Sequence, residues 1–148
     1  MSGVILAYAG AGLAAVLAGI GSTIGVMVAG KAAAGVSSEK PDLFGKLLVL
    51  QALPGTQGIY GFLIAVLILG KTTADLSVAA GWNLFFASLP IAIVGLISGI
   101  AQGKTAVAAI HMTGKQPDAS GKGITMTALV ETYAILALLT SILLWTNI

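Results

Sequence analysis

The sequence predicts an all-α membrane protein whose four transmembrane helices form a duplicated helical hairpin. Hydrophobic residues make up 57% of the 148 positions and charged residues only 8%, whereas soluble domains carry about 25% charged residues. Four apolar runs follow one another, and each can supply the roughly 20 residues that cross a bilayer as a helix. The two halves of the chain also resemble each other, and the resemblance predicts the duplication.

The four predicted helices occupy about residues 4–30, 47–70, 84–112 and 123–147. The first run lacks the basic start of a cleaved signal peptide, so it is expected to be the first transmembrane helix. Three polar turns separate the runs, with the sequences VSSEKPDLFGK, GKTTADLSVAAGWN and TGKQPDASGKG. An even number of spans places both termini on the same side of the membrane.

The lysines predict which side that is. The chain has seven lysines and no arginine, and six of the lysines lie in or near the first and third turns, leaving only Lys71 at the second. By the positive-inside rule the first and third turns are cytoplasmic and both termini lie outside. The small net charge of +2 argues against a nucleic-acid-binding surface. The absence of cysteine excludes disulfides and thiolate metal sites.

The two halves align without a gap at an offset of 76 residues. EKPDLFGKLLVLQALPGTQGIYGFLI, which begins at Glu39, matches KQPDASGKGITMTALVETYAILALLT, which begins at Lys115. The shared Pro-Asp and Gly-Lys pairs make chance similarity a poor explanation. We therefore predict a single membrane domain over 1–148, with hairpin repeats at about 1–72 and 73–148. In this alignment Glu131 faces Gly55, so only one copy carries the carboxylate.

Small residues form a stripe on the first predicted helix and another on the third. Such stripes let helix backbones approach closely in lipid. Two arrangements fit: a compact monomeric bundle, or an inner wall where the first and third helices of many copies meet around an axis. The stripes alone do not decide between them; they consist of Ala7, Ala11, Ala14, Ala18, Gly21, Gly25 and Ala29, and of Ala92, Gly95, Gly99, Gly103 and Ala106.

Glu131 is the only charged residue between Gly123 and Ile148. A carboxylate at the centre of a transmembrane helix costs about 2.5–3.5 kcal/mol on insertion scales, and such residues are usually functional. Other polar side chains are predicted at the same depth: Gln102 on the third helix, and Thr56, Gln57 and Tyr60 on one face of the second.

Pro54 interrupts the second helix beside these polar residues. A proline removes a backbone N–H and leaves the carbonyl of Leu50 without its helical donor. The helix is therefore expected to loosen here, so that a backbone oxygen near Leu53 can turn inward.

This set of groups consists of hard oxygen donors with one formal negative charge. Hard cations take carboxylate, amide, hydroxyl and carbonyl oxygens, and a single negative charge best matches a monovalent cation. Na⁺ at Glu131 would form a neutral pair and would use these oxygens as ligands. A proton would neutralise Glu131 without them. The alternative is that the glutamines and the threonine are interhelical hydrogen-bonding groups worth about 0.6 kcal/mol each.

The motifs LPGTQGIYGF, SGIAQGK and LVETYAILALL resemble the membrane-rotor proteolipid of V-type ATPases, the K or c subunit, in its sodium-translocating bacterial form. The resemblance covers nearly the whole chain and implies a ring of identical subunits in a bacterial plasma membrane. It implies a stator subunit that supplies an arginine, and a central-stalk subunit that links the ring to a soluble ATPase head. It further implies a hydrogen bond from Tyr60 to the glutamate, and Na⁺ ligands at Leu53 (carbonyl), Thr56, Gln57, Gln102 and Glu131.

Three other functions remain open at this point. The same rotor could carry H⁺, which an assay of Na⁺ dependence would reveal. A small multidrug or solute transporter with a buried glutamate would explain neither the duplication nor the oxygen donors. A channel-forming or structural ring without a motor would make Glu131 dispensable. No nucleophilic triad or phosphate loop is present, so the subunit is expected to be a non-catalytic part of an ion-translocating ATPase.

Overall fold

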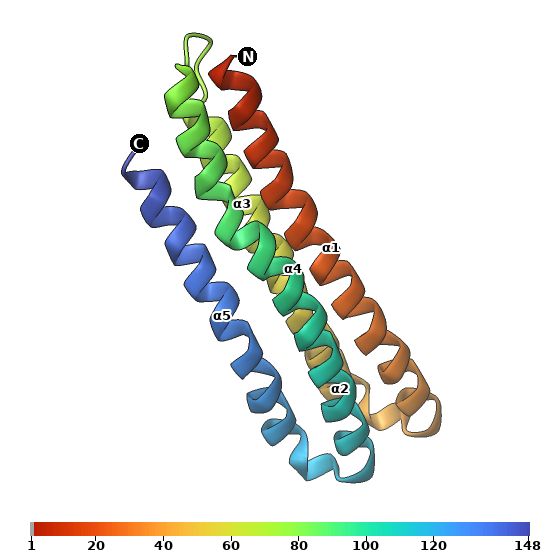
Figure 1. Ribbon diagram of the computed structural model, residues 1–148. Helices are drawn as coiled ribbons and strands as arrows, with labels where there is room; N and C mark the ends of the chain where they lie inside the picture. The colour runs from red at the N-terminus through yellow and green to blue at the C-terminus, as the bar shows by residue number, and fades with distance from the viewer. Residues whose placement is uncertain (1) are drawn as a thin grey trace.

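The computed structural model describes residues 2–148 as a bundle of long helices joined by short turns (Figure 1). Four helical segments are long and apolar enough to cross a membrane, which confirms the predicted all-α membrane fold. The N- and C-termini lie at the same end of the bundle (Figure 1). The helices are α1 (Gly3–Glu39), α2 (Phe44–Ala52), α3 (Thr56–Lys71), α4 (Val78–Lys115) and α5 (Ser120–Thr146), with 3₁₀ turns η1 (Pro41–Leu43), η2 (Leu53–Gly55) and η3 (Pro117–Ala119).

The second membrane span is broken in the middle, at Pro54, where the sequence predicted a loosened helix. The chain leaves α2 at Ala52, makes the 3₁₀ turn η2 over Leu53–Gly55, and resumes as α3 at Thr56. A proline cannot donate the helical hydrogen bond, and the tighter 3₁₀ turn accommodates its ring. Pro54 itself is buried against Gly25 of α1, because a Cβ added to that glycine would come within 2.7 Å of the proline Cβ.

The helices run further into the first and third turns than the sequence predicted. We expected α1 to end near residue 30, but it continues to Glu39; α4 likewise continues to Lys115. The polar residues of these turns therefore do not mark the ends of the helices. Both helices stop at the residue before a proline, Lys40 (φ −135°, ψ 72°) and Gln116 (φ −135°, ψ 88°), where helical geometry is disfavoured.

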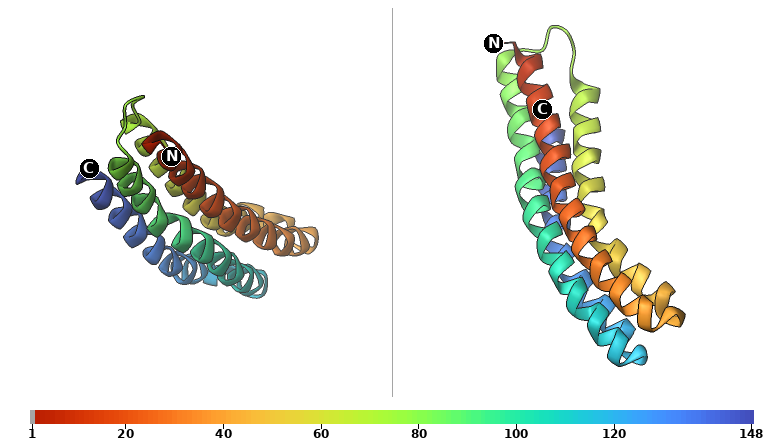
Figure 2. Two further views of the ribbon diagram at one scale, coloured as in Figure 1. Left: turned by 45° about the horizontal axis from the view of Figure 1, so that its top comes forward. Right: turned by 90° about the vertical axis from the view of Figure 1, so that its right-hand side faces the viewer.

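The two small-residue stripes face each other inside one chain. A Cβ added to Gly21 would lie 2.6 Å from the carbonyl oxygens of Gly95 and Leu96, and one added to Gly99 would lie 2.6 Å from the carbonyl carbon of Gly21. Figure 2 shows α1 and α4 side by side along their lengths, flanked by α3 and α5. The stripes are therefore used in packing α1 against α4 within the chain, and by themselves say nothing about contacts between copies.

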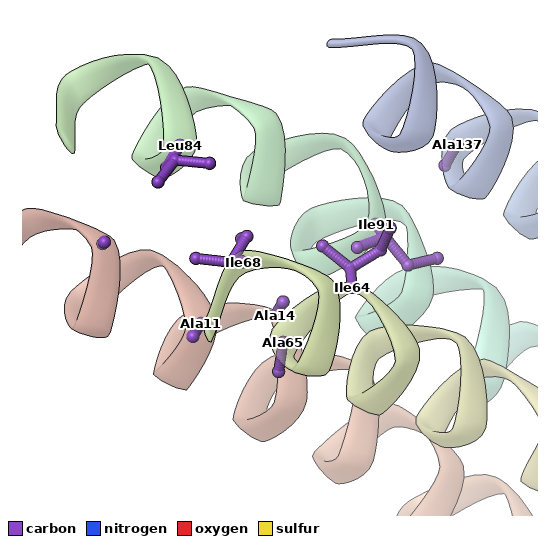
Figure 3. Packing of buried hydrophobic residues seen from close by; sticks show 9 residues of the cluster. Ala11, Ala14, Ile64, Ala65, Ile68, Leu84, Ile91 and Ala137 are labelled. Carbon is purple, nitrogen blue, oxygen red and sulfur yellow. The ribbon is translucent and has the colours of Figure 1, made fainter. Parts of the chain in front are cut away.

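The hydrophobic core lies in two clusters, one toward each end of the bundle. Ile64 and Ile68 of α3 fill the space beside Ala11 and Ala14 of α1, and Ile91 of α4 packs against them (Figure 3). Large side chains on α3 thus complement small ones on α1. Between the two clusters several buried side chains are polar, among them Gln57, Ser98 and Gln102.

Lysines of the first half of the chain donate hydrogen bonds to carbonyls of the second half at both ends of the bundle. Lys46 donates a hydrogen bond to the carbonyl of Pro117 at 3.0 Å, and Lys71 donates to the carbonyl of Trp145 at 2.8 Å. Trp145 in turn donates from Nε1 to the carbonyl of Leu67 at 2.9 Å. The two contacts of Trp145 tie α3 to α5 at the end that carries the chain termini, and the Lys46 contact ties α2 to η3 at the other end.

Candidate ion-binding site

A polar cluster lies where α3, α4 and α5 meet in the middle of the bundle. Gln57 of α3 and Gln102 of α4 have no solvent exposure, although both are polar. Glu131 of α5 is half-buried beside them in the single chain. Every buried side-chain nitrogen and oxygen within residues 2–148 has a hydrogen-bond partner, as expected where an unpaired polar group would be costly.

Glu131 receives hydrogen bonds from two helices. The hydroxyl of Tyr60 donates to its Oε1 at 2.5 Å, and Nε2 of Gln102 lies 3.5 Å from its Oε2. Tyr60 is one helical turn beyond Gln57 on α3, and positions three or four apart share a face. The carboxyl group is therefore held between α3 and α4 from both sides.

The two glutamines are joined side chain to side chain. Nε2 of Gln57 donates to Oε1 of Gln102 at 2.5 Å and to Oγ of Ser98 at 3.2 Å. Nε2 of Gln102 also donates to the backbone carbonyl of Thr127 at 3.1 Å. The hydroxyl of Ser98 donates to the carbonyl of Val130 at 3.3 Å. Each amide nitrogen is thus fully used, and the amide oxygens keep a free lone pair.

The broken helix supplies two further oxygens. The hydroxyl of Thr56 lies 3.1 Å from the carbonyl oxygen of Leu53, and 3.4 Å from Oε1 of Gln57. Leu53 follows the last residue of α2, so its carbonyl is near the negative end of that half-helix. Half-helix ends and unwound carbonyls of this kind coordinate cations in membrane transporters.

The structure brings all six residues singled out in the sequence into one hydrogen-bonded cluster. Ser98 was not predicted, although it lies four residues before Gln102, and therefore on the same face of α4. The backbone carbonyls of Thr127 and Val130 were not predicted either, because no side-chain pattern can reveal them. The six predicted residues are Leu53, Thr56, Gln57, Tyr60, Gln102 and Glu131.

A second residue that the sequence did not single out is Ser22, on α1. Its Oγ accepts a hydrogen bond from the backbone N–H of Gly58 at 2.8 Å. Gly58 is the third residue of α3, and the residue before that helix, Gly55, has no side chain to cap it. The first N–H groups of a helix need such a partner. Ser22 therefore caps α3 from a neighbouring helix and fixes the half-helix that carries Thr56 and Gln57.

The chemistry of the cluster favours a small, singly charged cation. The available donors are one carboxylate, two amide oxygens, a hydroxyl and a backbone carbonyl. Within residues 2–148 no three His, Asp or Glu side chains gather closely enough to hold a metal ion. Hard oxygen ligands with a single negative charge fit Na⁺ better than a divalent ion.

Comparison with known proteins decides the family. The sequence model for the C subunit of ATP synthase matches residues 9–68 and matches again at 85–144. The chain belongs to the ATP synthase C-subunit family. The two matches together cover most of the chain, and the second begins 76 residues after the first.

The family's curated members include close relatives of the chain. The K subunit of the V-type sodium ATPase of Enterococcus hirae is 50% identical over 145 residues, which cover 98% of this chain and 93% of that one. The K subunit of the A-type ATP synthase of Methanocaldococcus jannaschii is 44% identical over 142 residues, 95% of this chain and 61% of that one. The 16 kDa proteolipid of the human V-type proton ATPase is 30% identical over 111 residues, 75% of this chain and 72% of that one.

Proposed function

We propose that this protein is the ion-carrying subunit of a membrane rotor ring in a rotary V-type ATPase, and that it carries Na⁺. The ring consists of copies of this chain, and each copy moves its ion across the membrane as the ring turns. The chain catalyses no reaction itself. The observation that carries the proposal is the hydrogen-bonded group of oxygen donors around Glu131. This chain is also 50% identical to a subunit of a sodium ATPase.

The Na⁺ ligands in this proposal are the carbonyl oxygen of Leu53, the hydroxyl of Thr56, Oε1 of Gln57 and of Gln102, and the carboxylate of Glu131. Tyr60 holds the carboxylate in place through its hydroxyl. A charge in the membrane interior is costly, and the cation offsets that cost by neutralising Glu131. Na⁺ is the cargo of the rotor, so the site must release it as well as bind it.

The proton is the alternative cargo, because the human relative at 30% identity is named as a proton ATPase subunit. A proton would neutralise Glu131 without any help from the amide oxygens. Full burial of Gln57 and Gln102 beside the carboxylate therefore supports Na⁺. The same oxygen-rich site argues against a multidrug transporter, since drug-sized ligands need a mostly apolar and aromatic pocket.

The proposed partners and topology follow from the same assignment. We propose that a membrane stator subunit supplies an arginine to the empty site, because this chain has none. A central-stalk subunit would link the lysine-rich turns to a soluble ATPase head. The first and third turns would face the bacterial cytoplasm and both termini the outside. The matched turns before Pro41 and Pro117 and the two family matches support a duplicated hairpin, with repeats at about 1–72 and 73–148.

Competition between Na⁺ and a carboxyl reagent tests this function. A carbodiimide reacts with a protonated carboxyl group, so it should label Glu131 in purified rings without Na⁺. Added Na⁺ should slow the labelling, and more strongly at higher pH, because fewer protons then compete for the site. Gln102→Ala should weaken the protection but keep the labelling, since the carboxyl remains. Glu131→Gln should abolish the labelling.

The outcomes separate the two cargoes. Protection by Na⁺ that depends on Gln102 supports the sodium rotor. Labelling of Glu131 without any protection by Na⁺, over the whole pH range in which the ring stays intact, contradicts it and leaves the proton as cargo. K⁺ at the same concentration is the control for ionic strength.

A further inference from the structure

The hydrogen bonds around Gln57 determine which way its side-chain amide points. It lies in the interior with no solvent exposure. Its nitrogen has two hydrogens to place, and the two acceptors within reach are Oε1 of Gln102 at 2.5 Å and Oγ of Ser98 at 3.2 Å. With both N–H groups so engaged, Oε1 of Gln57 faces Thr56, 3.4 Å away. Oε1 of Gln57 can therefore contact the proposed cation only while Nε2 points toward Gln102 and Ser98.

Ser98 can accept from this nitrogen because its own proton is committed elsewhere. Its hydroxyl donates to the backbone carbonyl of Val130 at 3.3 Å, so a lone pair of the oxygen is left facing Gln57. A hydroxyl has one donor and two acceptor positions. The Val130 carbonyl belongs to the residue directly before Glu131, so the bond also ties α4 to the backbone that carries the carboxylate.

The partner glutamine is anchored in a parallel way. Nε2 of Gln102 donates to the carbonyl of Thr127 at 3.1 Å, which turns its Oε1 toward Gln57. The two amides therefore form a chain whose ends both rest on backbone carbonyls of α5, one directly and one through Ser98. The carbonyls cannot reverse their polarity, so they fix which end of each amide is oxygen.

From this geometry we infer that Ser98 is a positioning residue that sets the Na⁺ preference of the site by holding the Gln57 amide with its oxygen toward the ion. The inference rests on the proposed function of the cluster. Ser98 is not a ligand: it contacts the nitrogen of Gln57, on the side away from Thr56. Without its hydroxyl, one buried N–H of Gln57 has no partner, and an unpaired buried donor is unfavourable. The amide is then held only by its bond to Gln102, so its oxygen is less firmly fixed toward the cation.

Loss of the hydroxyl should penalise Na⁺ much more than H⁺. Na⁺ needs the Gln57 oxygen held in place as a ligand, whereas protonation of Glu131 needs no amide oxygen. The Ser98→Ala ring should therefore need about tenfold more Na⁺ for half-protection of Glu131 from a carbodiimide, the effect of one lost hydrogen bond. The pH dependence of labelling without Na⁺ should stay as in the unsubstituted ring. A purely structural defect would change both the Na⁺ concentration for half-protection and the pH dependence of labelling.

Two comparisons make the test specific. Ser88→Ala is the matched control: Ser88 is also buried on α4, but its hydroxyl donates to the carbonyl of Phe85 in its own helix. Ser88→Ala should leave both the Na⁺ titration and the pH dependence of labelling unchanged. Gln57→Ala and the double variant Gln57→Ala/Ser98→Ala should have equal Na⁺ midpoints, because Ser98 acts through Gln57.

Each outcome bears on the inference. A raised Na⁺ midpoint in Ser98→Ala alone, with no added effect in the Gln57→Ala background, supports it. A Ser98→Ala midpoint equal to that of the unsubstituted ring overturns it while the sodium rotor stands. An additive effect of the two substitutions also overturns it. If Na⁺ fails to protect even the unsubstituted ring, the proposed sodium function fails first, and this inference with it.

Discussion

Deleting the Tyr60 hydroxyl tests whether the observed hydrogen bond to Glu131 stabilises the ion-binding arrangement. The hydroxyl donates to Oε1 of Glu131 at 2.5 Å. Tyr60→Phe removes this oxygen and keeps the ring, so the packing of α3 changes little. A hydrogen bond to a charged group contributes about 1.5–3 kcal/mol. Gln102 remains beside the carboxylate in this variant, so the expected loss is smaller, about 1–2 kcal/mol.

A change of about 1–2 kcal/mol corresponds to a factor of about 5–30 in an equilibrium constant. The Tyr60→Phe ring should therefore need about 5–30 times more Na⁺ to protect Glu131 from a carbodiimide. Labelling without Na⁺ should become faster, because the carboxyl group is no longer held between α3 and α4. The rate of labelling as a function of Na⁺ concentration, measured on intact rings, gives both quantities.

Tyr133→Phe is the control for this substitution. Tyr133 lies two residues from Glu131 on α5, but its side chain is 69% exposed in the single chain. It should leave the Na⁺ titration unchanged. If Tyr60→Phe also titrates like the unsubstituted ring, the hydrogen bond to Glu131 contributes nothing to ion binding. Equal shifts in the two variants would show that the loss of any nearby tyrosine hydroxyl has this effect, and would refute the argument from geometry.

Two further predictions concern the packing that supports the site. Gly99→Ala places a Cβ 2.6 Å from the backbone of Gly21 and should destabilise the fold by about 1–3 kcal/mol in thermal unfolding. Gly45→Ala, in open space, should not destabilise the fold. If the two variants unfold at the same temperature, that result would argue against close α1–α4 packing. Ser22→Ala removes the cap on α3 and should cost about 0.5–2 kcal/mol, whereas exposed Ser38→Ala should be neutral. An unchanged unfolding temperature in Ser22→Ala would contradict the capping role.

The membrane fold and most of the site could be predicted because their signals lie in residue types. A charged residue in an apolar run, a proline before a Thr-Gln pair and a glutamine on the next helix are visible without coordinates. The helical rise of about 1.5 Å per residue, counted from the lysines at the turns, then predicts one depth for Gln57, Gln102 and Glu131, and the structure brings them together. The loosening at Pro54 was predictable because a proline removes a helical N–H; the complete break was not, since Pro90 lies inside the continuous helix α4.

Other features could not be predicted because they depend on which surfaces meet. The length of α1 was underestimated, since the polar residues near its end stay helical up to Glu39. The small-residue stripes left open whether their partners lie in the same chain or in another copy, and the structure shows Gly21 facing Gly99 in the same chain. Ser22 and Ser98 are small enough to resemble packing residues, and their roles became visible only through the groups opposite them, Gly58 and Gln57.

The most direct test of the whole account is a count of Na⁺ bound per chain in the purified ring. Glu131 is the one carboxylate in the cluster, and the aligned position in the first half is Gly55, beside Val26 of α1. Equilibrium binding of radioactive Na⁺ should therefore saturate at one ion per chain, and Glu131→Gln should abolish it. Binding of two ions per chain, or binding that survives Glu131→Gln, would contradict the account.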